Sequence, residues 1–399
     1  MTGKKIWEQL NRVLVPLVFL LIIIGGGLWQ FLMPDRSYSA SERRVLAQEP
    51  EFSAENVLDA SYMADFETYL TDQFPMRDKW ITVKAYTGLL LGQRENGGVY
   101  MTKDDYLIEL HRESDLAEGQ KEQNTEYLMS FMLDMAKLYG PEHVRVMLVP
   151  TADCIWADKL PGSVQLLNQT AYLENLSGEL DAQGDGYAQM LVDTAGELSA
   201  HAQEAIFYRT DHHWTALGAY YGYAAYVQSF ADGAGNMRDK SDYEFVIATE
   251  EFSGTTAAKC GMYHMTDSIE LVYPVAEEEY YVNHNAGMVI SDSLYETQKA
   301  HGDDPYAVYL GGNDAIVTIE TTTDDGSYVT HKKLLIIRDS YANCFVPYLT
   351  SDYGIITLVD PRHYNGSIRA LMDEGYTDVL ILYNLPNFVG DRQIYKIGR

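Results

Sequence analysis

The segment LLIIR, residues 334–338, begins the stretch that decides the fold, and three further elements follow it at short intervals: GIITLVD (354–360), SIRALMDEG (367–375) and DVLILYN (378–384). Three of the four segments are short, nearly uninterrupted apolar runs. Such runs are typical of strands in a parallel sheet that is covered on both faces. The remaining segment, SIRALMDEG, reads as a helix that ends at Gly375, because glycine is favoured at the end of a helix. Strands that alternate with helices over short connections predict an α/β fold with a doubly wound parallel sheet.

Upstream segments extend this pattern. VRVMLVP (144–150) is another apolar run, and the amphipathic spacing of residues 119–139 predicts a helix directly before it. Residues 61–93 also have helical spacing. Residues 231–330 differ, since they are rich in Thr, Tyr, Val and turn residues and interrupt the α/β rhythm. We therefore expect a β-rich insertion at about 231–330.

The N-terminal region has the composition of a membrane anchor. Residues 13–33 contain no charged side chain and are long enough to span a bilayer as one transmembrane helix. Lys4, Lys5 and Arg12 precede this run, which by the positive-inside rule places the N-terminus in the cytoplasm. A cleaved signal peptide is the alternative, although bulky residues stand where a small-residue cleavage site is expected. The predicted order is a cytoplasmic tail (1–12), a signal anchor (13–33), a juxtamembrane spacer (34–60) and an α/β domain (61–399) outside the cytoplasm, held at the cell membrane by a single pass.

Charge limits the classes of partner. The formal net charge of the 399 residues is −29, and the part after residue 33 holds 26 basic and 57 acidic residues. A region this acidic repels the phosphates of nucleic acids, so we expect no nucleic-acid partner. A charged polymer such as alginate or teichoic acid could bind through a local basic pocket, but a neutral carbohydrate polymer is the easier substrate. Three cysteines (Cys154, Cys260 and Cys344) form no CxxC or Cys/His metal motif.

The stretch TDHHWT (210–215) carries the clearest chemical signal. Asp211 and His213 are two residues apart, so in extended backbone their side chains point to the same side. A carboxylate there can bind one imidazole nitrogen and leave the other to act as a base. Thr215 can cap the helix expected to follow. The alternative is a packed loop without chemical function.

A second signal is IIRDSYANCFVPYL (336–349), in which Ser340 follows an apolar strand and precedes a helix expected to begin near Tyr341. A residue at the carboxyl end of a parallel strand lies where α/β folds bind ligands. The N-terminus of the following helix offers backbone N–H groups to a developing oxyanion. Taken alone an Asp-Ser pair is weak, because it also serves as an ordinary helix cap. The Asp-Ser pair becomes informative only in combination with the Asp-x-His pair of residues 211–213.

Together these two stretches resemble the DHHW family, which is similar to the alginate O-acetyltransferase group of permuted SGNH hydrolase-like enzymes. The resemblance covers roughly residues 40–399 and includes the DQFPMRD and MLVPTADCIWADKLP segments. It implies that Ser340 is the nucleophile, His213 the base and Asp211 the residue that orients His213. It also implies a sugar-polymer acceptor and a membrane-bound O-acyltransferase partner.

Other positions follow from the same resemblance. Arg338 stands where the related GDS block has glycine. It is a candidate for contacting a substrate carboxylate, and the alternative is that it simply faces solvent. Asn313, in the segment GGND (311–314), is a candidate oxyanion donor, although this segment is also a strong turn signal. His212 is a candidate substrate contact. Tyr341 and Asn384 are further candidates, because both lie at strand ends on the expected active side of the sheet.

The implied chemistry is acyl transfer through an acyl-serine, by an acetyltransferase or an acetylesterase, and it requires neither metal nor cofactor. Two alternatives belong to other classes of protein. Asp-His-His is also a metal-ligand string in phosphoesterases, but the further Asp clusters that hold two metals are not evident in the sequence. The other alternative is a non-catalytic glycan-binding protein of the cell envelope, since the 31 Tyr and 5 Trp residues offer surfaces for stacking on sugars.

Overall fold

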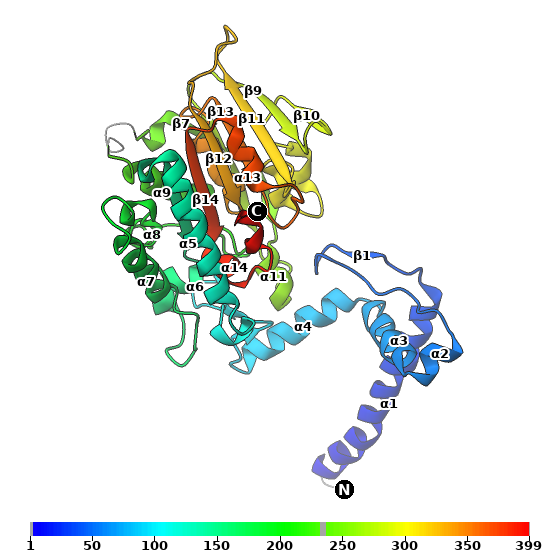
Figure 1. Ribbon diagram of the computed structural model, residues 1–399. Coiled ribbons are helices and arrows are strands. Elements are labelled where there is room, and N and C mark those ends of the chain that lie inside the picture. Colours follow the sequence, from blue (N-terminus) through cyan, green and yellow to red (C-terminus); the bar gives the residue numbers. More distant parts are fainter. Residues whose placement is uncertain (1–2, 232–236, 399) are drawn as a thin grey trace. The chain divides into compact units, whose positions relative to one another are not determined.

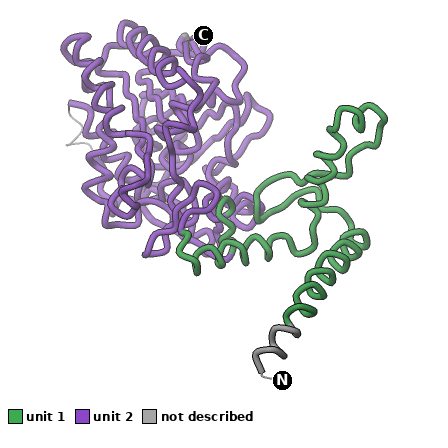
Figure 2. Tube along the Cα trace, turned by 90° about the horizontal axis from the view of Figure 1, so that it is seen from below, with its two compact units in different colours: residues 1–93, 258–263 green, residues 94–257, 264–399 purple. Residues whose placement is uncertain are grey.

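The computed structural model describes residues 3–231 and 237–398, and the chain divides into two compact units (Figure 2). The smaller unit consists of residues 1–93 and 258–263, and the larger consists of residues 94–257 and 264–399. The short helix α11 (Thr255–Cys260) begins in the larger unit and ends in the smaller.

The smaller unit is mainly helical. It contains α1 (Gly3–Leu32), the two-stranded β1 (Tyr38–Ser39) and β2 (Arg44–Val45), α2 (Ala54–Leu58), α3 (Ser61–Asp72) and α4 (Arg77–Leu90). The helical spacing predicted for residues 61–93 is confirmed, and it forms two helices, α3 and α4. Among the described residues, one helix is long and apolar enough to cross a membrane, and its candidate span is Asn11–Leu32.

Ion pairs tie the β1–β2 segment to α3 and α4. Arg44 Nη2 lies 2.5 Å from Asp72 Oδ1, and Arg77 Nε lies 2.7 Å from Glu42 Oε1. The hydrogen bond from Arg44, opposed by partial burial, lowers the pKa of Asp72 to about 2. These pairs join positions that are 28 and 35 residues apart in the chain.

A seven-stranded mixed sheet forms the centre of the larger unit (Figure 1). Its strands, in spatial order, are β10 (Val289–Ser291), β9 (Glu279–His284), β11 (Ile316–Thr322), β13 (Ile355–Val359), β12 (Lys333–Arg338), β14 (Asp378–Asn384) and β6 (Val144–Val149). The neighbours β13, β12, β14 and β6 pair in parallel. β11, β9 and β10 pair antiparallel.

The parallel strands confirm the α/β prediction, but the sheet, which was predicted to be parallel, is mixed. Three antiparallel strands from the β-rich stretch extend the sheet at one edge. Apolar runs identify buried strands without giving their direction, so the sequence could not show this. The same stretch also contains the separate pair β7 (Tyr243–Phe252) and β8 (Asp267–Pro274). Small strands β3 (Glu95–Asn96), β4 (Val99–Met101) and β5 (Leu107–Glu109) form a third sheet.

Both faces of the central sheet are covered, which explains the unbroken apolar strands. Alternate residues of β12 point to opposite faces, so Leu334 and Ile336 join one core while Leu335 and Ile337 join the other. α9 (Ala216–Gln228), α8 (Thr194–Ala200) and α12 (Ala342–Phe345) contribute to the first core. α5 (Gln120–Tyr139), α7 (Gln169–Asp181), α13 (Ile368–Leu371) and α14 (Leu385–Gly390) contribute to the second.

The helix α9 is held tightly against the segment before it. An ideal Cβ added at Gly218 would lie 2.1 Å from the carbonyl oxygen of Ile206, which belongs to rigid backbone. We expect Gly218→Ala to destabilise the protein by about 1–3 kcal/mol, as overpacked cores do. Gly178→Ala in α7 is the matched control, because nothing lies within 4 Å of its added Cβ. Thermal unfolding should show a lower midpoint for the first variant and an unchanged or higher midpoint for the second. Equal thermal midpoints in Gly218→Ala and Gly178→Ala would contradict the close contact between α9 and Ile206.

Candidate active site

Two separate segments of the larger unit bring Asp211, His213 and Ser340 together. Asp211 and His213 lie in the turn that precedes α9, and the Thr215 side chain caps that helix by accepting from the Gly218 N–H. This confirms the predicted cap. Ser340 lies two residues beyond the end of β12, at the carboxyl end of the parallel strands.

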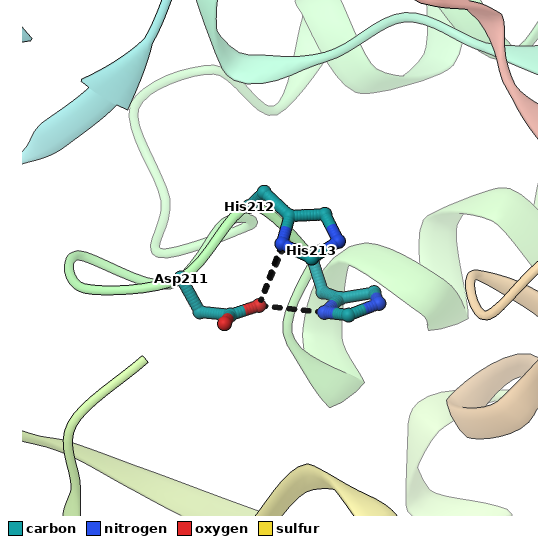
Figure 3. Close-up of side chains that lie close together, drawn as sticks. All are labelled: Asp211, His212 and His213. Carbon is teal, nitrogen blue, oxygen red and sulfur yellow. Dashed lines mark hydrogen bonds and ion pairs between the residues drawn. The ribbon is translucent and has the colours of Figure 1, made fainter. Parts of the chain in front are cut away.

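The Asp211 carboxylate holds the His213 side chain in place. Its Oδ1 lies 2.6 Å from His213 Nδ1 and also accepts from the His213 backbone N–H at 3.0 Å. Figure 3 shows the contact from Asp211 to each of the two neighbouring histidines. Since an ionised carboxylate only accepts hydrogen bonds, Nδ1 of His213 carries the proton in this contact.

The other ring nitrogen of His213 faces the serine. His213 Nε2 lies 2.8 Å from Ser340 Oγ, so with Nδ1 protonated the serine hydroxyl donates to the imidazole. The ring of Tyr306 stacks on His213 with centroids 3.8 Å apart and restricts its tilt. All three members of the Asp211–His213–Ser340 cluster are buried. The arrangement can draw a proton from the serine hydroxyl toward His213.

Asp211 remains ionised in this environment. Burial opposes its charge, but electrostatic attraction to the neighbouring His212 and His213, together with hydrogen bonds from His213 and Thr255, holds its pKa well below the usual range. A carboxyl group with a depressed pKa stabilises the fold above the pKa of the unfolded chain and loses this contribution as the pH falls. Asp211 can therefore serve as a fixed negative charge at neutral pH.

Metal binding at this place does not fit the contacts. Asp211, His212 and His213 offer ligand atoms within 4.8 Å of one another, the arrangement on which the metal alternative rests. The nearest atoms are already engaged in hydrogen bonds. Asp211 Oδ1 and His213 Nδ1 contact each other, and His212 Nδ1 lies 2.6 Å from Thr255 Oγ1. A metal ion would have to replace this network.

The structure places Arg338 inside the protein. Its side chain is fully buried, and Nη1 donates to Asn313 Oδ1 at 2.7 Å. Burial lowers the pKa of the Arg338 guanidinium, while the carboxylate of Asp360, 3.9 Å away, acts in the opposite direction. In this conformation Arg338 therefore contacts Asn313 and does not face solvent.

Asn313 is oriented by two buried donors. Its Oδ1 accepts from Arg338 and, at 3.1 Å, from Asn343 Nδ2. Because the amide oxygen binds both donors, the amide NH₂ group of Asn313 points away from them. Asn313 itself is exposed.

Tyr341 and Asn384 are buried, and both contact one carboxylate. Asp339 accepts from the backbone N–H of Tyr341 at 2.9 Å and from the backbone and side-chain N–H groups of Asn384 at 3.1 and 2.9 Å. The Tyr341 hydroxyl donates to the carbonyl oxygen of His212 at 2.5 Å. These bonds join the turn that carries Ser340 to β14 and to the turn that carries His213.

Sequence reasoning did not single out Asp339 or Thr255. Asp339 is fully buried, and burial raises its pKa against the opposing charge of Arg362. Its position next to Ser340 was a usable signal, but the partners that anchor it are distant in sequence. Thr255 lies in the β-rich stretch, where nothing in the local pattern sets it apart.

A cavity of about 810 Å³ lies elsewhere, between α5 and α7. Thr125, Leu133 and Tyr172 are among its lining residues, and none of the residues considered above lines it. The Asp211–His213–Ser340 cluster and this cavity are therefore separate features.

The sequence matches the DHHW protein family over residues 120–359. A DHHW family protein from Eubacterium siraeum has a similar structure, with 25% identity, a TM-score of 0.59, and coverage of 76% of this chain and 95% of that one. Bacillus cereus PatB1, whose structure carries a sulfonyl adduct, is 17% identical with a TM-score of 0.57, covering 75% of this chain and 100% of that one. The O-acetyltransferase domain of Pseudomonas putida AlgJ is 12% identical with a TM-score of only 0.42, covering 74% of this chain and 93% of that one.

No curated protein matches the chain. Because the family match spans more than half of its residues and includes the TDHHWT stretch, this chain belongs to the DHHW family.

Proposed function

We propose that this protein is a membrane-anchored serine O-acetyltransferase or acetylesterase that acts outside the cytoplasm on a glycan of the cell envelope or on an exopolysaccharide. The observation that carries the proposal is the position of His213, 2.6 Å from Asp211 and 2.8 Å from Ser340. Nucleophile, base and orienting carboxylate are thus within hydrogen-bond reach of one another, which is the geometry of an activated serine.

The proposed reaction has two steps. Ser340 Oγ attacks the carbonyl carbon of an acetyl donor while His213 Nε2 takes the hydroxyl proton, and His213 then gives that proton to the departing group. In the second step a sugar hydroxyl, or water, gives its proton to His213 and attacks the acyl-serine. Ser340 takes this proton from His213 as the ester bond between its Oγ and the acyl group breaks. Asp211 keeps Nδ1 of His213 protonated throughout, and no cofactor takes part.

Several further roles belong to this proposal. We assign the domain to the SGNH hydrolase type, with Arg338 in place of the glycine of the GDS block. The NH₂ group of Asn313 is the candidate oxyanion donor, because Arg338 and Asn343 fix the orientation of its amide. His212, whose side chain is 25% exposed, is the candidate substrate contact. Tyr341 and Asn384 support the turn around Ser340.

The membrane arrangement is part of the same proposal. The candidate span Asn11–Leu32 follows Lys4 and Lys5, which favours a cytoplasmic N-terminus. The bulky residues at the place of a small-residue cleavage site favour an uncleaved anchor. Residues 34–60 would then connect the anchor to an extracytoplasmic domain over residues 61–399. A membrane-bound O-acyltransferase partner would supply acyl groups from the other side of the membrane.

A covalent probe tests the proposed nucleophile directly. The sulfonyl adduct of PatB1 suggests phenylmethylsulfonyl fluoride as the reagent. We expect one sulfonyl group on the full-length protein in detergent, located by peptide mass spectrometry on Ser340. Ser340→Ala should remain unlabelled, and Ser327→Ala, at an exposed serine, should be labelled like the wild type. A folded wild-type protein that resists both this probe and acetyl esters would favour the non-catalytic glycan-binding alternative.

A further inference from the structure

Every acceptor position of the Asp211 carboxylate is occupied. Oδ1 accepts the two bonds from His213 described above. Oδ2 accepts from the backbone N–H of Thr255 at 2.8 Å and from its hydroxyl group at 3.0 Å. A carboxylate offers about four lone-pair sites, so His213 and Thr255 share them equally.

Close backbone packing holds Thr255 at this position. An ideal Cβ on the preceding residue, Gly254, would lie 2.3 Å from the Asp211 Cβ and 2.4 Å from the carbonyl oxygen of Thr210. The Gly254 N–H donates to Thr210 Oγ1 at 3.1 Å. Glycine thus lets the segment from the β-rich stretch lie directly against the turn that carries Asp211.

The hydroxyl group of Thr255 also determines the proton positions around it. It has one hydrogen, and the ionised Asp211 can only accept, so the hydroxyl donates to Asp211 Oδ2. The contact of 2.6 Å between His212 Nδ1 and Thr255 Oγ1 must then be a bond donated by the histidine. One hydroxyl therefore connects His212 to the carboxylate that binds His213.

From these contacts we infer that Thr255 is a positioning residue of the active site, which fixes the rotation of the Asp211 carboxylate and places the proton of His212 on Nδ1. This inference rests on the proposed function. If Asp211 could rotate, Oδ1 would leave the line to His213 Nδ1 and the imidazole would lose its orientation. The β-rich stretch thus supplies part of the catalytic apparatus, although it carries none of the three reacting groups.

The test compares three variants of the full-length protein in detergent. Thr255→Val removes the hydroxyl at nearly unchanged volume, and Thr255→Ser keeps a hydroxyl. Thr256→Val is the matched control, because Thr256 is the adjacent threonine, is fully buried, and its hydroxyl has no hydrogen-bond partner among the described residues. The loss of a hydrogen bond to a charged group should lower kcat for a chromogenic acetyl ester about 10- to 100-fold in Thr255→Val, with KM little changed. Thr255→Ser should recover most of this loss, and Thr256→Val should equal the wild type.

A second readout separates this inference from the proposed function. The short hydrogen bond between His213 and Asp211 should give a low-field proton resonance in the NMR spectrum. We expect this resonance to be shifted or lost in Thr255→Val and retained in Thr255→Ser and Thr256→Val. An unchanged resonance and unchanged kcat in folded Thr255→Val would overturn the role of Thr255 and leave the proposed function standing. A wild-type protein that is inactive toward every ester would refute the proposed function, and the resonance would still decide whether Thr255 positions the carboxylate.

Discussion

Ser340→Ala is expected to lower kcat for hydrolysis of a chromogenic acetyl ester by at least about 10³-fold, because loss of an activated serine removes the acyl-enzyme route as a whole. The hydroxyl lies 2.8 Å from His213 Nε2, and in the proposed mechanism no other group forms the bond to the acyl carbon. Initial rates with the full-length protein in detergent would measure the effect. The remaining rate would reflect binding and oxyanion stabilisation alone.

The control for this experiment is a serine that has no part in the mechanism. Ser327→Ala, at an exposed position, should leave both kcat and the thermal midpoint unchanged. Both variants should unfold at the temperature of the wild type, since Ser340→Ala removes one oxygen atom and leaves only a small void. Similar activity in Ser340→Ala and the wild type would show that another group is the nucleophile.

Asp211→Asn is expected to lower kcat by about 10⁴-fold, and the contacts of Thr255 give the reason. The backbone N–H and the hydroxyl of Thr255 both donate to Asp211 Oδ2. The amide oxygen of an asparagine would therefore take the position of Oδ2. Its NH₂ group would then face His213 Nδ1 and donate to it. His213 would have to carry its proton on Nε2, toward Ser340, where it could no longer accept the serine proton.

Asp193→Asn provides the matched comparison for Asp211→Asn. Asp193 caps α8 by accepting from the Gly196 N–H at 2.8 Å, and asparagine caps helices equally well. We expect unchanged kinetics in that variant. A decrease of less than tenfold in Asp211→Asn would mean that the carboxylate neither orients His213 nor stabilises its charge.

Much of the fold was predictable because the relevant signals are local. The strands β6, β12, β13 and β14 each lie within a residue or two of a predicted apolar run, and α5 covers nearly all of its predicted range. The helix expected after Ser340 is present but short, since α12 ends at Phe345 and a 3₁₀ turn with Pro347 follows. Strand direction and partner order were not predictable, because they depend on pairing between distant segments.

The candidate site residues show the same difference between local signals and long-range contacts. Asp211 and His213 were candidates from the residues themselves, because an Asp-x-His pair has a recognisable chemical meaning. Ser340 was a weak signal alone, and its role as the nucleophile came from the family resemblance. Their proximity was a hypothesis, as His213 and Ser340 are 127 positions apart. Arg338 had the residue type of a substrate contact, yet packing buries it completely and directs it to Asn313.

By itself, then, the sequence determined where strands and helices form and which side chains can exchange a proton or attack a carbonyl group. Those properties depend on residue type and on spacing over a few positions. Only the tertiary structure decided which atoms meet. Thr255 reaches Asp211 across 44 positions, and Asp339 reaches Asn384 across 45. The physical reason is that a hydrogen bond requires a particular distance and direction between two atoms, and for residues this far apart the packing of the whole core fixes both.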